Sequence, residues 1–533
     1  MEYTGQYLVF PETSNSYLQM TMLELMSILP SVALVVVTVS LLFIYGMSGY
    51  TVFKKRQIPG PTPIPFFGNL LPMAKRGFVY PLLEWKKKFG PVYGVYFGHK
   101  PVLVVTDLEM LKQIEVKEFN KFQNRWDIDL YPSPINKGIF FEKGANWKRI
   151  RSIISPTFSA GKLKQMCQQI NVCAEKLSQR LKGLSVGGQQ VEIKGYLSAF
   201  TMDVILMTAF GKNVDSQRNP NEPFVKNACN IFKDSVYTMP FVFLATLFPS
   251  MEKLGKKLEM CAWPKDAVNF IITAVREIVE ERRHEQEAKN HDFLQLMLDA
   301  EMPDDVDGDH FDANANVDKN KKRLTEDEII GQAFLFLIAG YETTASALQY
   351  MSYALATNPT VQDRVYEEID RVLGDEEPNY ENIINMRYME QVFNESLRMF
   401  PIVPIMTREA METVTIKGYQ IDKGTAVAVS VYALHHDPAN FPNPEVFDPE
   451  RFSPENKRKI NPIAFHPFGY GPRICIGMRL ALMEAKCAMV HMLRRVKLVR
   501  SEDTEVPLTF DNNRIMQPLN PIRLRIEPRN KTW

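Results

Sequence analysis

HPFGYGPRICIG, residues 466–477, is a loop of glycines and prolines around a single cysteine, and an amphipathic helical pattern follows it directly. From Phe468 to Gly477 the residues follow the order F-x-x-G-x-R-x-C-x-G, with the cysteine at position 475. Glycines allow tight turns and close approach of the backbone. The N-terminus of the following helix and its backbone N–H groups favour negative charge. The stretch therefore favours Cys475 as a thiolate.

The other five cysteines lie in helix-like patterns that lack such a loop, and none has CxxC spacing. They are sparse for a chain of 533 residues, which argues against a disulfide scaffold or a zinc site and favours a reducing compartment. We interpret them as small buried hydrophobic residues. They are Cys167, Cys173, Cys229, Cys261 and Cys487.

The composition is that of a globular protein with a sizeable core, since 45% of the residues are hydrophobic and 23% are charged. Basic and acidic residues nearly balance, with a formal net charge of +1. No global field favours DNA or RNA, so we predict no nucleic-acid partner.

The N-terminal part contains a membrane-spanning pattern. No charged residue occurs from Leu25 to Phe53, and its core, SILPSVALVVVTVSLLFIYGM, is long enough to cross a bilayer. Lys54, Lys55 and Arg56 follow at once, which places the later residues in the cytosol by the positive-inside rule. A cleaved signal peptide is the alternative, which the long polar lead disfavours. We expect a lumenal segment over residues 1–24, a transmembrane anchor over 25–53, a basic stop and proline-rich hinge over 54–69, and a cytosolic catalytic domain over 70–533.

Helical patterns dominate the body of the chain, whereas residues 414–431 carry β-branched residues around tight turns. The fold class predicted is therefore mainly α with a small β-region. Thr325 and Glu328 form a predicted capping box before a long apolar run that ends at Asn358. This run predicts one long helix through the interior. The polar stretch 301–323 before it is interpreted as a solvated loop rather than a calcium site.

With its full spacing, the Cys475 loop resembles the haem-binding loop of the cytochrome P-450 family, and further motifs occur in the expected order over nearly the whole chain beyond the anchor. The resemblance implies the cytochrome P-450 fold, haem b (iron protoporphyrin IX) as the cofactor and Cys475 as the proximal ligand of the iron. Thiolate ligation favours O–O cleavage over reversible oxygen binding. The other haem-contacting residues that the resemblance implies are Arg125, Trp147, Arg151, Arg408, Phe468, Arg473 and Gly477, of which the four arginines and Trp147 meet the two propionates.

A buried ion-pair triad is also implied by the resemblance. Glu395 and Arg398 lie one helical turn apart in NESLR, and Arg451 belongs to PERF. Removal of one partner would leave an uncompensated buried charge, so a structural role rather than a catalytic one is expected.

Within the long helix, AGYETT supplies Gly340, Glu342 and Thr343, which match the family's small residue, acid and alcohol beside the distal face of the haem. The resemblance implies that Thr343 and Glu342 hydrogen-bond dioxygen or water and relay protons, as monooxygenation requires. The structural alternative is that Thr343 bonds to a helix carbonyl and Glu342 is solvated.

Three functions remain open at this stage. The first is a monooxygenase, which inserts one atom of O2 into a lipophilic steroid, fatty acid, eicosanoid or xenobiotic. We rank it first because this chain keeps Thr343 and Thr344, the threonine pair that thromboxane-A synthase replaces with apolar residues. The runs LTEDEIIGQAFLFLIAGYE and ALHHDP resemble thromboxane-A synthase, which isomerises a prostaglandin endoperoxide without O2 or a reductase. A non-catalytic haem-binding protein is the third candidate.

The partners and the location follow from the first hypothesis. Electrons would come from NADPH through a haemoprotein reductase, with cytochrome b5 as a further candidate partner. The reductase is expected to be a separate protein, because no dinucleotide-binding fingerprint is evident in this sequence. The expected location is the endoplasmic reticulum membrane, with a single pass and a cytosolic catalytic domain. The substrate pocket is expected from residues 125–137, 232–248, 334–344 and 402–406.

Overall fold

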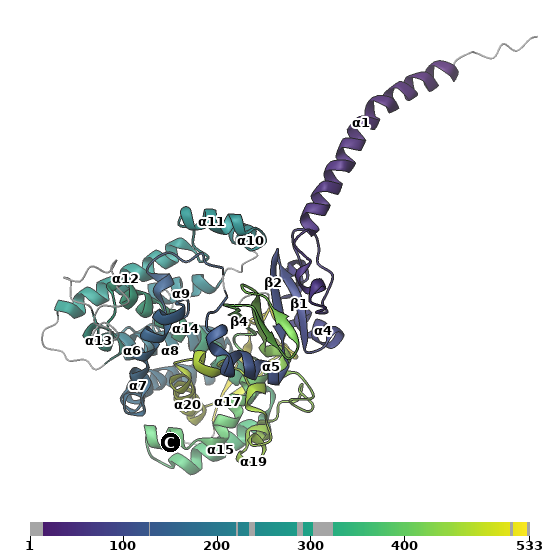
Figure 1. Cartoon of the computed structure of the whole chain (residues 1–533). Coiled ribbons are helices and arrows are strands. Elements are labelled where there is room, and N and C mark those ends of the chain that lie inside the picture. Colours follow the sequence, from purple (N-terminus) through teal and green to yellow (C-terminus); the bar gives the residue numbers. More distant parts are fainter. Residues whose placement is uncertain are drawn as a thin grey trace, which may run out of the picture.

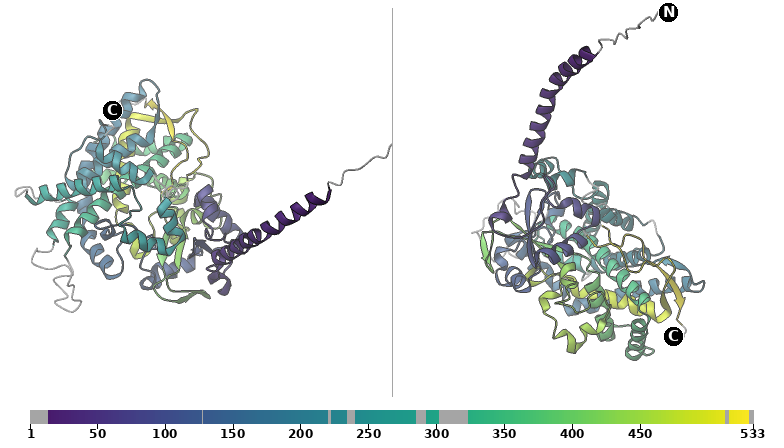
Figure 2. Two further views of the ribbon diagram at one scale, coloured as in Figure 1. Left: turned by 90° about the horizontal axis from the view of Figure 1, so that it is seen from above. Right: turned by 90° about the vertical axis from the view of Figure 1, so that its right-hand side faces the viewer.

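The computed structural model describes residues 14–126, 128–219, 222–233, 240–284, 292–301, 323–511 and 515–529 (Figure 1). A long N-terminal helix, α1 (Ser14–Met47), projects from a mainly helical body, and Figure 2 shows the same projection from two further sides. The helices of the body are α2 (Val52–Lys55), α3 (Leu70–Arg76), α4 (Val79–Phe89), α5 (Leu108–Lys112), α6 (Gly144–Ile154), α7 (Ala160–Ser185), α8 (Ile193–Phe210), α9 (Pro223–Lys233), α10 (Pro240–Leu247), α11 (Pro249–Lys257), α12 (Lys265–His284), α13 (Phe293–Asp299), α14 (Glu326–Thr357), α15 (Pro359–Leu373), α16 (Tyr380–Ile384), α17 (Arg387–Met399), α18 (Val431–His435), α19 (Pro454–Lys457) and α20 (Met478–Arg495).

Small sheets flank the helices. The largest has the strand order β1-β2-β7-β4, in which β2 and β7 are parallel and the other pairs are antiparallel. A second sheet has the order β3-β9-β8, and β5 pairs with β6 as a hairpin. The strands are β1 (Val92–Phe97), β2 (Lys100–Val105), β3 (Gln190–Glu192), β4 (Ile405–Glu409), β5 (Val414–Ile416), β6 (Tyr419–Ile421), β7 (Ala426–Ser430), β8 (Val496–Arg500) and β9 (Arg523–Pro528).

The predicted fold class is confirmed, including the strands expected between residues 414 and 431. Val431 itself begins helix α18 rather than ending a strand. The turn between β5 and β6 places Lys417 and Gly418 at φ values of +50° and +83°. Strands β1 and β2 were not predicted, although VYGVYF and KPVLVV are rich in the residues that favour strands.

Helix α14 crosses the interior and separates two hydrophobic cores. One core lies between α14, α7, α17 and α20, and the other lies between α14, α8, α6 and α12. The predicted capping box begins this helix, because the Thr325 hydroxyl accepts from the Glu328 N–H at 3.3 Å and the Glu328 carboxylate accepts from the Thr325 N–H at 3.0 Å. Residues 302–322 of the predicted solvated loop lie outside the described residues.

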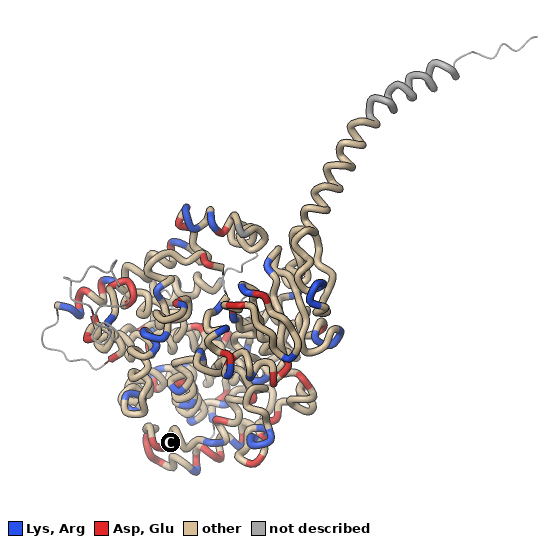
Figure 3. Tube along the Cα trace, viewed as in Figure 1, with Lys and Arg blue, Asp and Glu red and all other residues tan. Residues whose placement is uncertain are grey.

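The apolar span Leu29–Met47 of α1 is long enough to cross a membrane and is almost entirely exposed. The span Leu29–Met47 carries no Lys, Arg, Asp or Glu (Figure 3). It lies within the anchor predicted over residues 25–53. Tyr50 and Phe53, at the end of that range, instead pack against Tyr96 of β1. Helix α8 is also apolar and long enough, but 78% of it is buried in the body, so it is a core helix.

Candidate thiolate site

The loop around Cys475 enters helix α20 at its N-cap, Gly477. The Cys475 N–H donates to the Phe468 carbonyl at 2.9 Å, which closes the loop on itself. Burial raises the pKa of the Cys475 thiol, whereas the N–H groups of Gly477 and Met478 lower it. Cys475 nevertheless has accessible surface. A residue that is both accessible and surrounded by protein faces an internal space, so the thiol is available to a ligand inside the fold.

Arginine side chains gather around this thiol. Burial, together with repulsion from Arg408, lowers the pKa of Arg125 to about 9. Burial and repulsion from Arg125 lower the pKa of Arg473 to about 8. Burial also lowers the pKa of Arg151, and both Arg125 and Arg151 act electrostatically on Cys475. A bound anion would relieve this mutual repulsion, so the site fits a negatively charged group.

Arg408 supplies the most specific indication of an anion. Its side chain is 2% exposed, its Nη2 donates to Glu115 at 2.9 Å, and its Nη1 donates to the Thr407 carbonyl at 2.9 Å. The Nε of Arg408 is buried and has no hydrogen-bond partner. An unpaired buried donor costs stability, and a bound carboxylate would satisfy it. Arg408 is thus prepared for the type of group that sequence analysis expected it to bind.

Arg473 contacts backbone carbonyls on a neighbouring segment. Its guanidinium donates to three backbone carbonyls, those of Gln123 at 2.9 Å, Ile139 at 3.2 Å and Glu142 at 2.8 Å. It also lies 4.2 Å from the centre of the Trp147 ring. Arg473 therefore ties the cysteine loop to residues 123–142. The sequence associated Trp147 with Arg151 through their helical spacing, whereas the structure stacks Trp147 on Arg473.

The distal residues of helix α14 face in different directions. The Thr343 hydroxyl donates to the Ala339 carbonyl at 2.7 Å, so its two lone pairs remain free to accept. Glu342 is not solvated, because its carboxylate pairs with Lys194 of α8 at 2.8 Å and accepts from Gln517 at 2.5 Å. A Cβ at Gly340 would lie 2.9 Å from Ile205 of α8. Gly340 therefore allows α8 and α14 to pack closely.

Ala339 lies in the predicted pocket stretch 334–344, but the sequence analysis did not assign it to the site beside Thr343. It is exposed although the surrounding turns of α14 are buried, and it lies one turn before Thr343. Its spacing of four residues from Thr343 places both on one helix face. The four-residue spacing between Ala339 and Thr343 was the signal in the sequence that could have identified Ala339.

The predicted ion-pair triad is confirmed. Arg398 makes two hydrogen bonds to Glu395, from Nε at 2.8 Å and from Nη2 at 2.9 Å, and both side chains are fully buried. Arg451 pairs with the same carboxylate at 3.3 Å. The Nη1 of Arg398 also donates to the His435 carbonyl at 3.0 Å.

The cysteine loop depends on a glycine at position 471. Gly471 has a φ of +69°, and a Cβ there would lie 2.1 Å from the Glu115 carbonyl oxygen. We expect Gly471→Ala to lower the free energy of unfolding by about 3 kcal/mol or more, since backbone strain and overpacking add. Urea unfolding measures the change. Gly418→Ala is the control, because Gly418 has a similar φ of +83° and open space at its Cβ; an equal loss in both variants would contradict the role of the contact with Glu115.

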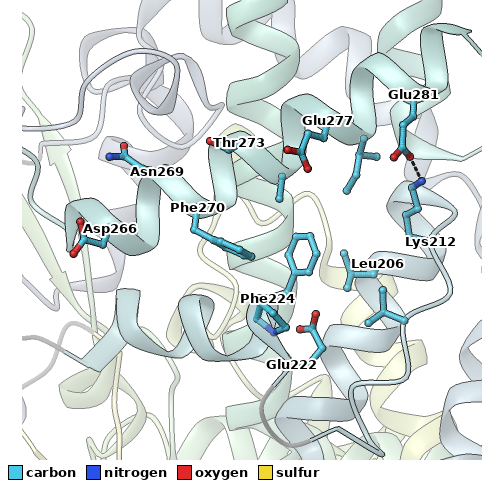
Figure 4. A pocket seen from close by; sticks show the side chains of 14 residues that line it. Leu206, Lys212, Glu222, Phe224, Asp266, Asn269, Phe270, Thr273, Glu277 and Glu281 are labelled. Atoms are coloured by element: carbon cyan, nitrogen blue, oxygen red, sulfur yellow. Dashed lines mark hydrogen bonds and ion pairs between the residues drawn. The ribbon is translucent and has the colours of Figure 1, made fainter.

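The stretches predicted to line a substrate pocket stay a prediction. Residues 127 and 234–239 lie outside the described residues. A described pocket of about 700 Å³ lies elsewhere, between the end of α8, α9 and α12 (Figure 4). Phe224 and Phe270 form part of its wall and carboxylates such as Glu222 and Glu277 also line it, but it includes no residue of the thiolate site.

Comparison with known proteins agrees with this geometry. The sequence model of the cytochrome P-450 family matches residues 58–526, and the chain belongs to that family. Cytochrome P-450 3A6 of Oryctolagus cuniculus is 37% identical over 513 residues, which are 95% of this chain and 99% of that protein. Cytochrome P-450 3A16 of Mus musculus is 38% identical over 506 residues, 94% of this chain and 97% of that protein. Cytochrome P-450 3A41 of the same species is 39% identical over 501 residues, 93% of this chain and 96% of that protein.

The protein is thus a membrane-anchored haem-thiolate monooxygenase with haem as its cofactor. The relatives named above belong to the 3A group, which makes the isomerase function less favoured than the monooxygenase function. The residues around Cys475 fit the cofactor: one accessible thiol lies among buried and half-buried arginines, and the buried Arg408 has an unpartnered donor.

Proposed function

We propose that this chain oxidises lipophilic substrates, such as steroids, fatty acids, eicosanoids or xenobiotics, and that Cys475 would hold the haem iron through its thiolate. Arg125, Arg151 and Arg408 would hold the propionates, and Arg473 would fix the loop that carries the ligand. The observation that carries this proposal is the unpartnered, buried Nε of Arg408 within a cluster of mutually repelling arginines. When bound, thiolate-ligated haem supplies the oxygen-activating chemistry.

Thr343 and Glu342 would manage protons on the side of the site formed by α14. The Thr343 oxygen would accept a hydrogen bond from water in the internal space, because its own proton is directed to the Ala339 carbonyl. Glu342 is held by Lys194 and Gln517, so it would exchange protons only when these contacts open. We therefore assign Thr343 the direct role and Glu342 the supply of protons to it.

Replacement of Thr343 tests this assignment. We expect Thr343→Ala to lower product formation by about 10²-fold, the effect of losing a positioned proton-transfer group, while NADPH consumption continues. Thr343→Ser keeps the hydroxyl and is the matched control. Product and NADPH are measured together in reconstituted enzyme; equal product yields from the alanine variant and the unchanged enzyme would refute the role of Thr343.

The position of the anchor helix α1 supports a lipophilic class of substrates. The end of α1 meets the body at Gly46, where a Cβ would lie 2.8 Å from the Phe66 ring. The Phe66 ring centre lies 6.3 Å from that of Phe248, the residue between α10 and α11. The apolar helix α10 therefore lies near the anchor, where lipid-dissolved molecules would enter. We propose a single-pass location in the endoplasmic reticulum membrane, with residues 1–24 in the lumen, the anchor over residues 25–53, a hinge over 54–69 and the catalytic domain over 70–533 in the cytosol.

The proposed electron donors are an NADPH-dependent haemoprotein reductase and, as a further partner, cytochrome b5. Arg479 supports a docking surface near the cysteine loop, because it is exposed in the first turn of α20. Basic patches of this kind attract acidic redox partners.

One experiment separates the monooxygenase from the isomerase. Purified protein with haem receives a prostaglandin endoperoxide without reductase, NADPH or O2, and products are followed by mass spectrometry. We expect no conversion by a preparation whose reduced carbon-monoxide spectrum confirms thiolate ligation, and NADPH-dependent oxidation when steroids or fatty acids are supplied with reductase. Rapid conversion of the endoperoxide would overturn the proposal.

A further inference from the structure

Glu115 and His466 form a buried pair between Arg408 and the cysteine loop. Glu115 lies in a short π-helix, residues Gln113–Lys117, and His466 begins the HPFG part of the loop. The Glu115 carboxylate contacts Arg408 Nη2 through Oε1 at 2.9 Å and His466 Nε2 through Oε2 at 2.5 Å. The side chains of Glu115 and His466 are fully buried, and that of Arg408 is 2% exposed.

Both nitrogens of the His466 ring face acceptors. Nε2 faces the Glu115 carboxylate, and Nδ1 faces the Ile463 carbonyl. A carbonyl oxygen cannot donate, so Nδ1 carries a proton. A second proton must then lie between Nε2 and the carboxylate, because two bare acceptors at 2.5 Å would repel. Glu115 and His466 together therefore hold one more proton than an ionised carboxylate beside a neutral imidazole.

This extra proton changes the charge near Arg408. A lone carboxylate at Glu115 would neutralise the guanidinium, whereas the protonated pair has no net charge. The cluster of Arg408, Glu115 and His466 then keeps a net charge of +1. Among the described neighbours, His435 adds no charge, because its Nε2 accepts the His466 N–H at 2.9 Å and its Nδ1 faces the Arg398 carbonyl. Arg125 adds positive charge near Arg408.

We propose that His466 is a positioning residue that compensates the charge of Glu115, so that Arg408 keeps a full positive charge for a haem propionate. This inference rests on the proposed function, since it assigns a propionate to Arg408. Glu115 contributes orientation, because it fixes the Nη2 side of Arg408 and leaves the buried Nε free. The same pair joins Arg408 to the loop of Cys475, because the Glu115 carbonyl also contacts Gly471.

Three variants of the full-length holoenzyme test the proposal. His466→Gln keeps a hydrogen-bond donor toward Glu115 but removes the ionisable ring, so Glu115 would neutralise Arg408. Glu115→Gln removes the carboxylate, and the double variant removes both groups and restores the net charge of +1. We expect only the single His466→Gln variant to be impaired.

Two measurements report on the haem directly. Transfer of haem to apomyoglobin should be about tenfold faster in His466→Gln than in the unchanged enzyme, and near normal in Glu115→Gln and the double variant. In His466→Gln the equilibrium between ferric and ferrous haem should shift about tenfold toward the ferric form. This shift corresponds to a reduction potential that is lower by about 59 mV for one electron. A purely structural role of His466 would leave the double variant no better than His466→Gln.

The outcomes are distinguishable from failure of the proposed function. A reduced carbon-monoxide spectrum typical of thiolate ligation in the unchanged enzyme confirms Cys475 as the ligand, and its absence would overturn the proposed function first. With that spectrum present, unchanged haem transfer and potential in His466→Gln would overturn the charge compensation. Lack of rescue in the double variant would do the same.

Discussion

Cys475→Ser should abolish monooxygenase activity, with product formation falling by about a thousandfold or more, equivalent to about 4 kcal/mol in the activation barrier. Serine preserves the size of the side chain and the turn, but its hydroxyl is not a thiolate donor and cannot favour O–O cleavage. The variant should also lose the reduced carbon-monoxide spectrum typical of thiolate ligation. Product formation with reductase and NADPH, together with that spectrum, measures both effects.

Cys261→Ser is the control for this replacement. Cys261 is buried and its pKa is raised by burial, but it lies between α11 and α12 in the second core and has no arginine cluster around it in the contacts described. It should retain thiolate ligation and most of its activity. A normal carbon-monoxide spectrum in Cys475→Ser would exclude Cys475 as the ligand.

The second large effect is on stability. We expect Arg398→Ala to lower the free energy of unfolding by about 3–5 kcal/mol, because it removes the closest cation from the fully buried Glu395 carboxylate. The longer contact with Arg451 at 3.3 Å and the hydrogen bond from the Asp448 N–H at 2.9 Å would remain. Since α17 packs against α14 and α20, haem retention should fall as well. Urea unfolding and the haem content of purified protein measure these losses.

Arg525→Ala provides the matched control, because Arg525 pairs with Glu527 at 2.9 Å while both side chains are substantially exposed. An exposed pair contributes only about 0–1 kcal/mol. The two variants remove the same group and differ in burial. Similar stabilities for Arg398→Ala and the unchanged protein would show that the triad does not hold the fold.

The triad shows how far local patterns can reach. Glu395 and Arg398 are neighbours on a helix because of their spacing, so their pairing needed no knowledge of the rest of the fold. Arg451 follows more than fifty residues later, and only its resemblance to a family motif placed it there. Arg398 and Glu395 also contact residues near 435 and 448 through the backbone, contacts that no spacing rule predicts.

The distal helix shows where sequence reasoning was incomplete. AGYETT predicts a site on one turn of α14, but the motif does not give the direction in which each residue faces. Glu342 pairs with Lys194, nearly 150 residues earlier, and Gly340 faces Ile205 of α8. These directions depend on how α8 packs against α14, and helix packing is a property of two distant segments together.

The sequence by itself determined the local features of this protein, and the resemblance of its motifs to a known family gave its class. A cysteine between glycines ahead of a helix, a long capped core helix and an apolar N-terminal span all depend on neighbouring residues, and local spacing specifies them directly. Only the tertiary structure decided which charges meet. Arg125, Arg408 and Arg473 come from three separate parts of the chain, and Glu115 and His466 are 351 residues apart. Electrostatic energy depends on distance in space and on burial, so the charge of this site exists only after the chain has folded.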